Sequence, residues 1–216
     1  MSDKPKQLRG IAVRDKLVGI ATELFYDHGV RAIGVDEVVR RAGMAKASLY
    51  RWFPTKDDLV LAVLQQRDDS FWARWDATAA RHPDARAELD AQLTWIQEVA
   101  TRKGYRGCAF INTAAEFSAA DSERIRQRCA EHEHELARRL RTLTARIGVD
   151  DHDRLADQLH LAIVGAFAVG GIYPQGGPAI RLRALAEDLI PQPAALQDNA
   201  SGAAVVDHAA TNQPHR

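Results

Sequence analysis

The chain has 216 residues, of which 46% are hydrophobic and 27% are charged, a composition typical of globular proteins. No apolar run approaches the roughly 18 residues that a membrane-spanning helix needs. The N-terminus is charged and unlike a secretory signal, and Cys108 and Cys129 lack the spacing of a disulfide framework or a zinc site. We therefore expect a cytoplasmic protein that has no membrane segment, bound metal or cofactor.

The formal net charge of zero hides an asymmetry along the chain. Residues 1–56 contain 11 Lys and Arg against 6 Asp and Glu, whereas residues 57–216 contain 18 against 23. A basic first quarter on an acidic body indicates that one end meets a polyanion. A solvated basic face would give the same pattern, so charge alone does not decide between the two.

Apolar residues recur at helical spacing along most of the chain, beginning with a stripe from Leu17 to Phe25. That first helix should end at Gly29, which suits the left-handed position after a helix. Short helices are then predicted over 35–42 and 46–53, and Thr55 is expected to cap a long fourth helix.

The fourth helix should run past Trp75 and break at His82. Beyond it the pattern predicts helices that carry Leu89 to Ala100, residues 106–118, Ile125 to Ile147, 155–170 and 179–189. No stretch alternates with period two for long enough to predict a strand. The predicted fold is therefore all-α, with an N-terminal three-helix unit and a C-terminal helical domain.

The composition shifts after Pro191 to Ala, Gln, Asn and Asp, which predicts a disordered tail over 191–216. The predicted organisation is a helix-turn-helix DNA-binding domain over 1–56 and a helical ligand-binding and dimerisation domain over 57–190.

Residues 34–53, GVDEVVRRAGMAKASLYRWF, carry the clearest functional pattern. They predict two short helices joined by a tight turn, and the outer face of the second bears small side chains beside polar and cationic ones. Small residues permit close approach to base edges in the major groove, while Ser, Tyr, Lys and Arg bind phosphates. The segment thus indicates a helix-turn-helix, although an ordinary helical corner with a solvated basic face fits the pattern as well.

Several stretches match a family pattern: Leu24-Phe25, Gly29, Val38, Ala42-Gly43, Lys46-Ala47-Ser48-Leu49-Tyr50-Arg51-Trp52-Phe53 and Pro54-Thr55-Lys56-Asp57-Asp58-Leu59. On these residues the N-terminal part resembles the DNA-binding domain of the TetR/AcrR family of bacterial transcriptional regulators. The remainder of the chain agrees with the family only in the number and length of its helices. Two positions depart from the pattern, because Gly34 and Ala45 stand where the family has Ser or Thr caps; a slightly softer recognition helix is expected.

The resemblance implies which side chains meet DNA. Tyr50 and Lys56 look like the family's phosphate ligands, and Trp52 either contacts the backbone or packs, with packing favoured. Residues 4–9 contain three further cations. They either form an arm along the DNA or, as we favour, take no part in DNA binding. The predicted DNA-binding residues are Lys46, Ala47, Ser48, Tyr50, Arg51, Trp52 and Lys56.

A small DNA reader needs a second copy, because two half-sites supply most of its specificity. The helix at 155–170 is apolar nearly all round after Leu159, so with the helix at 179–189 it is the predicted homodimer interface. The alternative is that the helix at 155–170 is only the central core helix, and a single helix can also serve both purposes.

A ligand pocket is predicted from aromatic and polar side chains on apolar helices. Glu116 stands among Ala and Phe and needs a partner, either a ligand or, as favoured, an Arg of a neighbouring helix. His132 interrupts an apolar stripe and would face a ligand or, more commonly, form a hydrogen-bonded core histidine. The candidate residues are Phe71, Trp75, Trp95, Phe110, Asn112, Thr113, Glu116, Phe117, His132, His160 and Phe167.

Alternatives from other classes have less support in the sequence. His132 and His134 lie two residues apart on a helix and point to different sides, so residues 131–135 predict a solvated charge run and no metal site. No catalytic motif or acid–base pair is found, and no enzyme is expected. An architectural nucleic-acid binder would not need so large an apolar body. We expect a homodimer that binds a palindromic operator on double-stranded DNA and is released by a small-molecule effector, the family default being repression, with activation left open.

Overall fold

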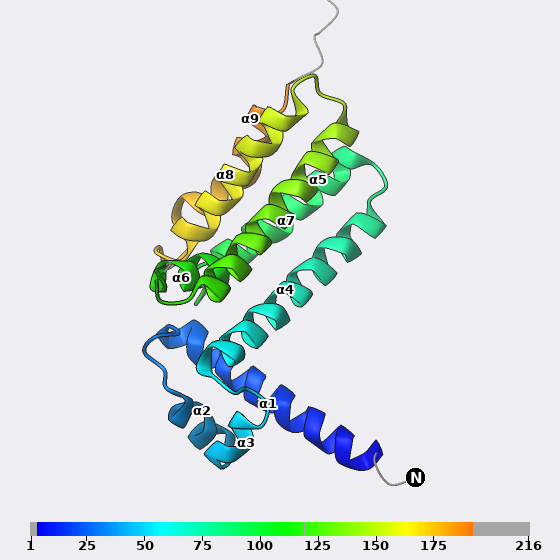
Figure 1. Cartoon of the computed structure of the whole chain (residues 1–216). Coiled ribbons are helices and arrows are strands. Elements are labelled where there is room, and N and C mark those ends of the chain that lie inside the picture. The colour runs from blue at the N-terminus through cyan, green and yellow to red at the C-terminus, as the bar shows by residue number, and fades with distance from the viewer. Residues whose placement is uncertain (1–3, 119, 192–216) are drawn as a thin grey trace, which may run out of the picture.

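The chain is described from a computed structural model, which covers residues 4–118 and 120–191 (Figure 1). Within these ranges all regular elements are helical, so the all-α prediction is confirmed. The predicted disordered tail lies outside the described residues except for Pro191. The helices are α1 (Lys4–His28), α2 (Val35–Ala42), α3 (Lys46–Tyr50), α4 (Lys56–Arg81), α5 (Ala85–Thr101), α6 (Ala109–Glu116), α7 (Glu123–Ile147), α8 (His152–Gly170), the 3-10 helix η1 (Gly177–Arg181) and α9 (Leu182–Leu189).

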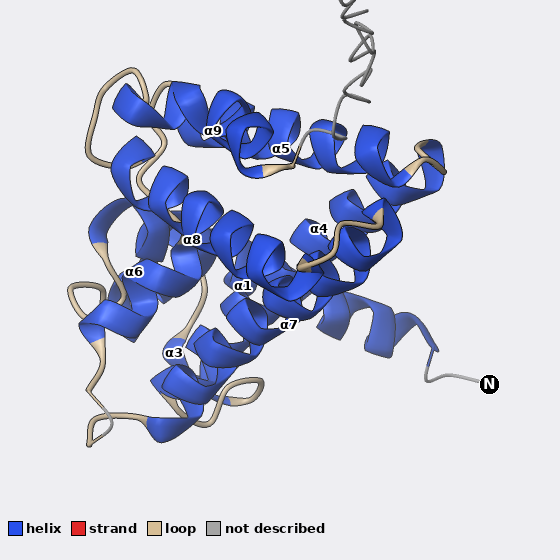
Figure 2. Cartoon of the chain, turned by 90° about the horizontal axis from the view of Figure 1, so that it is seen from above, coloured by secondary structure: helices blue, strands red, loops and turns tan. Residues whose placement is uncertain are grey.

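The helices form two bodies joined by α4, which rises from the small N-terminal body into the larger bundle (Figure 1). The bundle is built from α5, α7, α8 and α9, and α7 packs along α8 over much of its length. Figure 2 looks down on the same arrangement and shows α6 as a short helix beside the end of α8. α6 therefore stands at the junction between the bundle and the N-terminal body.

The N-terminal body is held by an apolar cluster centred on Leu17, Val38 and Leu49, each with no exposed surface. The first turns of α4 join this cluster through Leu59 and Leu64, and the neighbouring α6 and α7 also contribute to it. The N-terminal body consequently packs directly against elements that continue into the bundle.

Local signals in the sequence explain where several helices begin and end. Thr55 caps α4 with the predicted reciprocal bonds, since its hydroxyl accepts the Asp58 N–H and the Asp58 carboxylate accepts the Thr55 N–H. Gly43 adopts a left-handed φ of 64° after α2, which allows the abrupt turn into α3.

Several helices differ in extent from the prediction. The helix predicted over 106–118 is shorter, since α6 spans Ala109–Glu116, and the helix predicted over 155–170 begins earlier, at His152. The helix predicted over 46–53 ends as α-helix at Tyr50, although the chain stays wound and the Phe53 N–H still donates to the Leu49 carbonyl at 2.9 Å. The helix predicted over 179–189 is preceded and partly replaced by η1, because Pro178 follows two glycines with positive φ and starts a tighter turn.

The bundle has its own apolar cluster, in which α7 contributes most of its predicted stripe. Leu136, Leu140 and Leu143 are at most 2% exposed, and Leu159 and Ile163 of α8 are fully buried beside them. Among the described residues, none of the helices combines the length and the apolar character that crossing a membrane requires.

Candidate nucleic-acid interface and the cavities behind it

The packing of α2 and α3 fixes which face of α3 meets solvent. α2 buries Val38, Val39 and Ala42 against α1, and the Met44 N–H donates to the Val39 carbonyl to close the turn. Leu49 is the buried anchor of α3. Since residues three and four apart share a helix face, the side of α3 opposite Leu49 points outward.

The outward face of α3 is small at one position and polar or cationic around it. Lys46, Ala47, Tyr50 and Arg51 are exposed, and Ser48 is half-buried. Tyr50 is 41% exposed although it is a large aromatic side chain. A short side chain at Ala47 lets the helix approach a groove closely, while the hydroxyl and the cations around it can donate to phosphates and base edges.

The cations on this face differ in how they are paired. Lys46 Nζ lies 2.8 Å from the Asp36 carboxylate of α2, a contact that raises the pKa of Lys46. Arg51 has no ion pair with any residue that the structure describes. Arg51 is thus ready to meet a phosphate or a base, whereas Lys46 must first exchange Asp36 for the new partner.

Trp52 and Lys56 border the same face. Trp52 is half-buried against α1, where a Cβ on Gly10 would lie 3.1 Å from the indole, so the glycine makes room for the ring. Lys56 is half-buried at the start of α4, and burial lowers its pKa. At the caps of α2 and α3, Gly34 and Ala45 make no side-chain hydrogen bond, as expected for the two departures from the family pattern.

Glu116, at the end of α6, is bonded to the loop between α1 and α2. Its carboxylate accepts the N–H groups of Val30 and Arg31 at 3.1 and 2.7 Å. The guanidinium of Arg31 donates instead to the backbone carbonyl of Glu116 and to Asp121. The favoured pairing of Glu116 with an arginine of a neighbouring helix is therefore wrong, because its carboxylate binds two backbone N–H groups of the α1–α2 loop and no guanidinium among the described residues.

Arg106, just before α6, makes a second connection to the end of α1. Its backbone N–H donates to the Tyr26 hydroxyl at 2.8 Å, and its Nε donates to the Tyr26 carbonyl at 3.0 Å. Hydrogen bonds therefore join the segment before α6 to the end of α1, and the end of α6 to the loop that follows α1.

The predicted pocket residues fall into two cavities and their surroundings. A first cavity of about 410 Å³ lies between the end of α1, α4 and α6, and includes Asn112, Thr113 and Glu116. A second cavity of about 380 Å³ lies between α4, α5, α6, α7 and α8. Its lining contains the predicted residues Phe71, Trp95, Phe110, His132 and Phe167.

The other predicted pocket residues lie elsewhere. Trp75 is only 3% exposed within the bundle core, and Phe117 packs in the N-terminal cluster beneath the Arg31 guanidinium. His160 bonds Glu133, with 3.0 Å between Nε2 and Oε2. The residues predicted from the sequence to line one pocket therefore line two separate cavities or lie outside both. Their role in ligand binding stays a prediction.

The second cavity is also lined by residues that were not predicted, among them Arg67, Arg74, Arg102 and Tyr105. A signal for two of them was present, because positions 67, 71 and 74 follow the spacing of one helix face and therefore accompany Phe71. Arg102 and Tyr105 lie on the connection after α5, where no periodic pattern applies.

His132 is a buried histidine in a hydrogen-bonded network, the commoner of the two alternatives, and it also faces the second cavity. Its Nδ1 lies 2.7 Å from Asp68, whose carboxylate also contacts Arg128 at 2.6 Å and the Trp72 indole N–H at 2.8 Å. Burial lowers the pKa of His132. Burial acts in the opposite direction on Asp68, but the hydrogen bonds from His132 and Arg128 outweigh it and the pKa of Asp68 is lowered.

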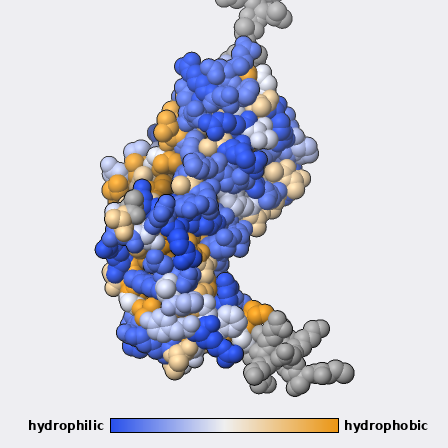
Figure 3. All heavy atoms as spheres, viewed as in Figure 1, coloured by the Kyte–Doolittle hydropathy of each residue, from blue (hydrophilic) through white to orange (hydrophobic). Residues whose placement is uncertain are grey.

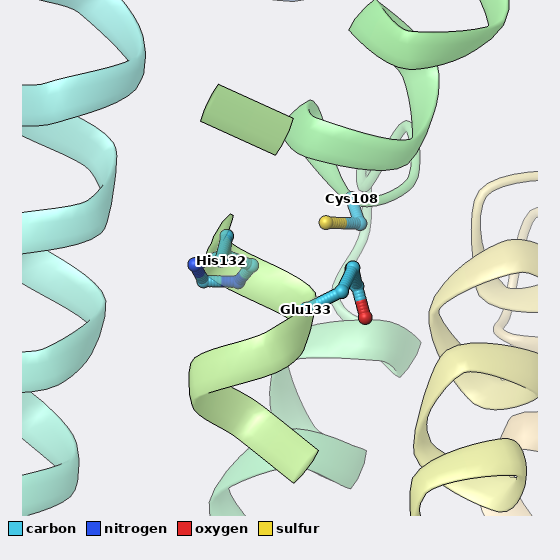
Figure 4. A group of neighbouring side chains, drawn as sticks. All are labelled: Cys108, His132 and Glu133. Carbon is cyan, nitrogen blue, oxygen red and sulfur yellow. The ribbon is translucent and has the colours of Figure 1, made fainter. Parts of the chain in front are cut away.

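One group of side chains has the composition of a metal site. Cys108, His132 and Glu133 offer ligand atoms within 4.8 Å of one another, and Figure 4 shows them converging from the start of α6 and from α7. Burial raises the pKa of the Cys108 thiol to about 11, and Glu133 is bonded to His160. A cation bound here would have to deprotonate the thiol and draw Glu133 away from His160.

The face formed by α8, η1 and α9 exposes large apolar side chains. Leu161 of α8 is 74% exposed, and Ile172, in the turn between α8 and η1, is 75% exposed. Hydrophobic surface gathers over this part of the molecule at the upper left of Figure 3. Five of the seven large apolar side chains that are exposed among the described residues belong to this face: Leu161, Ile172, Tyr173, Ile180 and Leu185.

Comparison with known proteins gives relatives for the N-terminal part. Residues 18–63 match the profile of the bacterial regulatory proteins of the tetR family. The transcriptional activator FasR of Mycolicibacterium smegmatis is 46% identical over 97 residues, covering 43% of this chain and 43% of FasR. The transcriptional repressor KstR2 of Rhodococcus jostii is 33% identical over 85 residues, covering 39% of this chain and 42% of KstR2. The chain thus spans less than half the length of these curated relatives.

Solved structures match over most of the chain. A TetR-family transcriptional regulator from Streptomyces coelicolor superposes with a TM-score of 0.77 at 29% identity, covering 82% of this chain and 93% of that one. The reduced form of NemR from E. coli has a TM-score of 0.75 at 20% identity, covering 85% and 100%, and shares the fold.

Proposed function

Because this chain belongs to the TetR/AcrR family of bacterial regulators, we propose that it is a ligand-responsive transcriptional regulator. In this proposal the protein is a homodimeric repressor that binds a palindromic operator through α2 and α3 and is released by a small molecule. Residues 1–56 bind DNA, and residues 57–190 bind the effector and the second protomer.

The observation that carries the proposal is the exposed face of α3. Leu49 anchors the helix from behind, and Ala47, Tyr50 and Arg51 are left exposed on one short element. This combination suits a recognition helix, because it supplies close approach, a phosphate donor and a cation that is not already paired with a described residue.

The apolar face of α8, η1 and α9 supports the dimer. Several large apolar side chains exposed on one part of a surface are typical of a protein–protein contact. A second copy of the chain would bury Leu161 and Ile172 across a two-fold axis and place two α3 helices on the same side of the assembly.

Effector release requires a path from the cavities to α3. The bonds of Glu116 and Arg106 supply one, since they join α6 to the end of α1 and the loop before α2. A ligand that favours a different position of α6 would shift the separation of the two recognition helices and lower operator affinity by its differential binding energy.

The test is to select bound duplexes from a random DNA pool with the purified full chain and then to measure affinity by fluorescence anisotropy. We expect a palindromic sequence that binds more tightly than an unrelated duplex, with the preference retained when the salt concentration is raised. Equal binding to both duplexes that disappears at higher salt would contradict sequence-specific regulation.

A further inference from the structure

The second cavity has the walls of an organic-ligand site. Aromatic rings surround it, with the centroids of Phe71 and Trp95 5.0 Å apart and the rings of Phe110 and His132 stacked at 3.7 Å. Its volume of about 380 Å³ lies in the range of small-molecule pockets, about 300–1,000 Å³. Such walls fit a flat or compact apolar group.

The charge around this cavity has one sign. Arg67, Arg74 and Arg102 line it, and no Asp or Glu does so within the part of the chain that the structure describes. None of the three makes an ion pair with a described residue, whereas Arg128 and Arg139 on the facing α7 are each paired with carboxylates. The cavity therefore carries an excess of positive charge that the described chain leaves unbalanced.

Aromatic rings hold two of these arginines near the cavity without neutralising them. The Arg67 guanidinium lies 4.9 Å from the centroid of the Tyr26 ring, and that of Arg74 lies 5.8 Å from the Trp95 ring. Stacked in this way, a guanidinium keeps N–H groups free for an anion.

Tyr105 adds a neutral donor between the arginines and the apolar walls. Burial raises the pKa of Tyr105, so its hydroxyl keeps its proton. The hydroxyl has no hydrogen-bond partner among the residues described. It can therefore donate to an oxygen of a ligand that reaches into the cavity.

We propose that the effector is an amphipathic organic anion, with an aromatic or similarly compact apolar body among Phe71, Trp95 and Phe110 and a carboxylate or sulfonate facing the arginines. This inference rests on the proposed function and names the chemical class of its effector. Lipophilic cations are disfavoured by the same charges, since they would meet three guanidinium groups with no carboxylate in the lining to offset them.

A matched pair of fluorescent probes tests the charge requirement. 8-Anilinonaphthalene-1-sulfonate is an aromatic anion, and N-phenyl-1-naphthylamine has the same ring skeleton without the sulfonate. We expect the anion to bind the full chain about tenfold more tightly, a difference of about 1.4 kcal/mol. Equal or tighter binding of the neutral probe would overturn the inference.

Substitutions then test whether the arginines cause the tighter binding of the anionic probe. Arg74→Gln combined with Arg102→Gln should weaken the anionic probe about tenfold and leave the neutral probe unchanged. Lys103→Gln is the matched control, since Lys103 adjoins Arg102, is exposed and does not line the cavity. Equal losses for both probes, or no loss for either, would contradict a role for these arginines in binding the anion.

Operator binding measured without any probe keeps the two proposals apart. If a specific operator is found and the anionic probe shows no preference, only the effector class is wrong. If the probes behave as expected and no operator is found, the anion site stands while the regulatory function fails.

Discussion

Among single residues, Lys46 at the start of α3 and Arg51 just after its end are both exposed, but they differ in whether they already have an ionic partner. Lys46 already has the Asp36 carboxylate at 2.8 Å, so a phosphate replaces an existing partner. Arg51 has no such partner among the described residues, and its contact with DNA is a net gain.

Arg51→Ala should therefore weaken operator binding about tenfold or more, and more than Lys46→Ala does. If Arg51 meets a phosphate, the slope of log affinity against log salt concentration should also fall by about 0.9. Anisotropy titrations at several salt concentrations measure both quantities. The control is Arg154→Ala, which removes an exposed arginine at the start of α8. An equally large loss of operator affinity in Arg154→Ala would argue against α3 as the element that contacts DNA.

Glu116 binds two backbone N–H groups that otherwise have to find water or another partner. Glu116→Ala should lower the free energy of unfolding by about 1–3 kcal/mol, the cost of leaving the partly buried Val30 N–H without a partner. It should also reduce the factor by which an effector lowers operator affinity. Glu123→Ala, an exposed glutamate at the start of α7, should change neither thermal unfolding nor this factor.

His132 predicts a pH dependence of stability. Burial lowers the pKa of His132 below the ordinary 6.5, and it outweighs the hydrogen bond to Asp68, which acts in the opposite direction. Near pH 6.5 the unfolded chain takes up a proton that the folded protein takes up only at lower pH. The contribution of His132 is therefore complete above about pH 6.5 and is lost as the pH falls from there.

Denaturant unfolding of the wild type and His132→Asn at pH 7.5 and 5.5 isolates this contribution. The asparagine amide can still donate to Asp68 but does not titrate. We expect the wild type to lose more stability than the variant between the two pH values, and identical losses would show that His132 does not carry the effect.

At the level of elements, helix ends and buried stripes were predicted closely because they depend on residues near one another in sequence. Thr55 with Asp58, and Gly43 after α2, act over a single turn. The hydrogen-bond partners of Glu116 could not be predicted from neighbouring residues. One of them, Val30, lies 86 residues away in the sequence, and the bond forms only when α6 packs beside the end of α1. The predicted pocket residues divide between two cavities for a similar reason. Helical periodicity identifies which face of a helix is buried, but it does not identify which cavity that face borders.

The face formed by α8, η1 and α9 is the proposed dimer interface, and a single substitution on it tests that role. Leu161→Arg should convert the proposed dimer into a monomer, because it places a charge on an apolar surface that the second copy would cover. Sedimentation velocity measures the change. Ala77→Arg, on the exposed side of α4, should leave the dimer intact, and a wild-type chain that sediments as a monomer would contradict this interface.

For the whole molecule, α6 is the element through which an effector and an operator would influence each other. It borders both cavities, its last residue Glu116 is bonded to the loop after α1, and Arg106 just before it is bonded to the end of α1. By linkage, an anion that lowers operator affinity must bind less tightly when the operator is present, and by the same factor.

The most direct test of the account is hydroxyl-radical footprinting of the selected duplex with the wild type and with Arg51→Ala. We predict two protected half-sites related by a two-fold axis and centred about one helical turn, roughly 34–36 Å, apart or at a related spacing, with protection lost at both in the variant. A single protected half-site, or protection that is unchanged in Arg51→Ala, would contradict a dimer that reads DNA through α3.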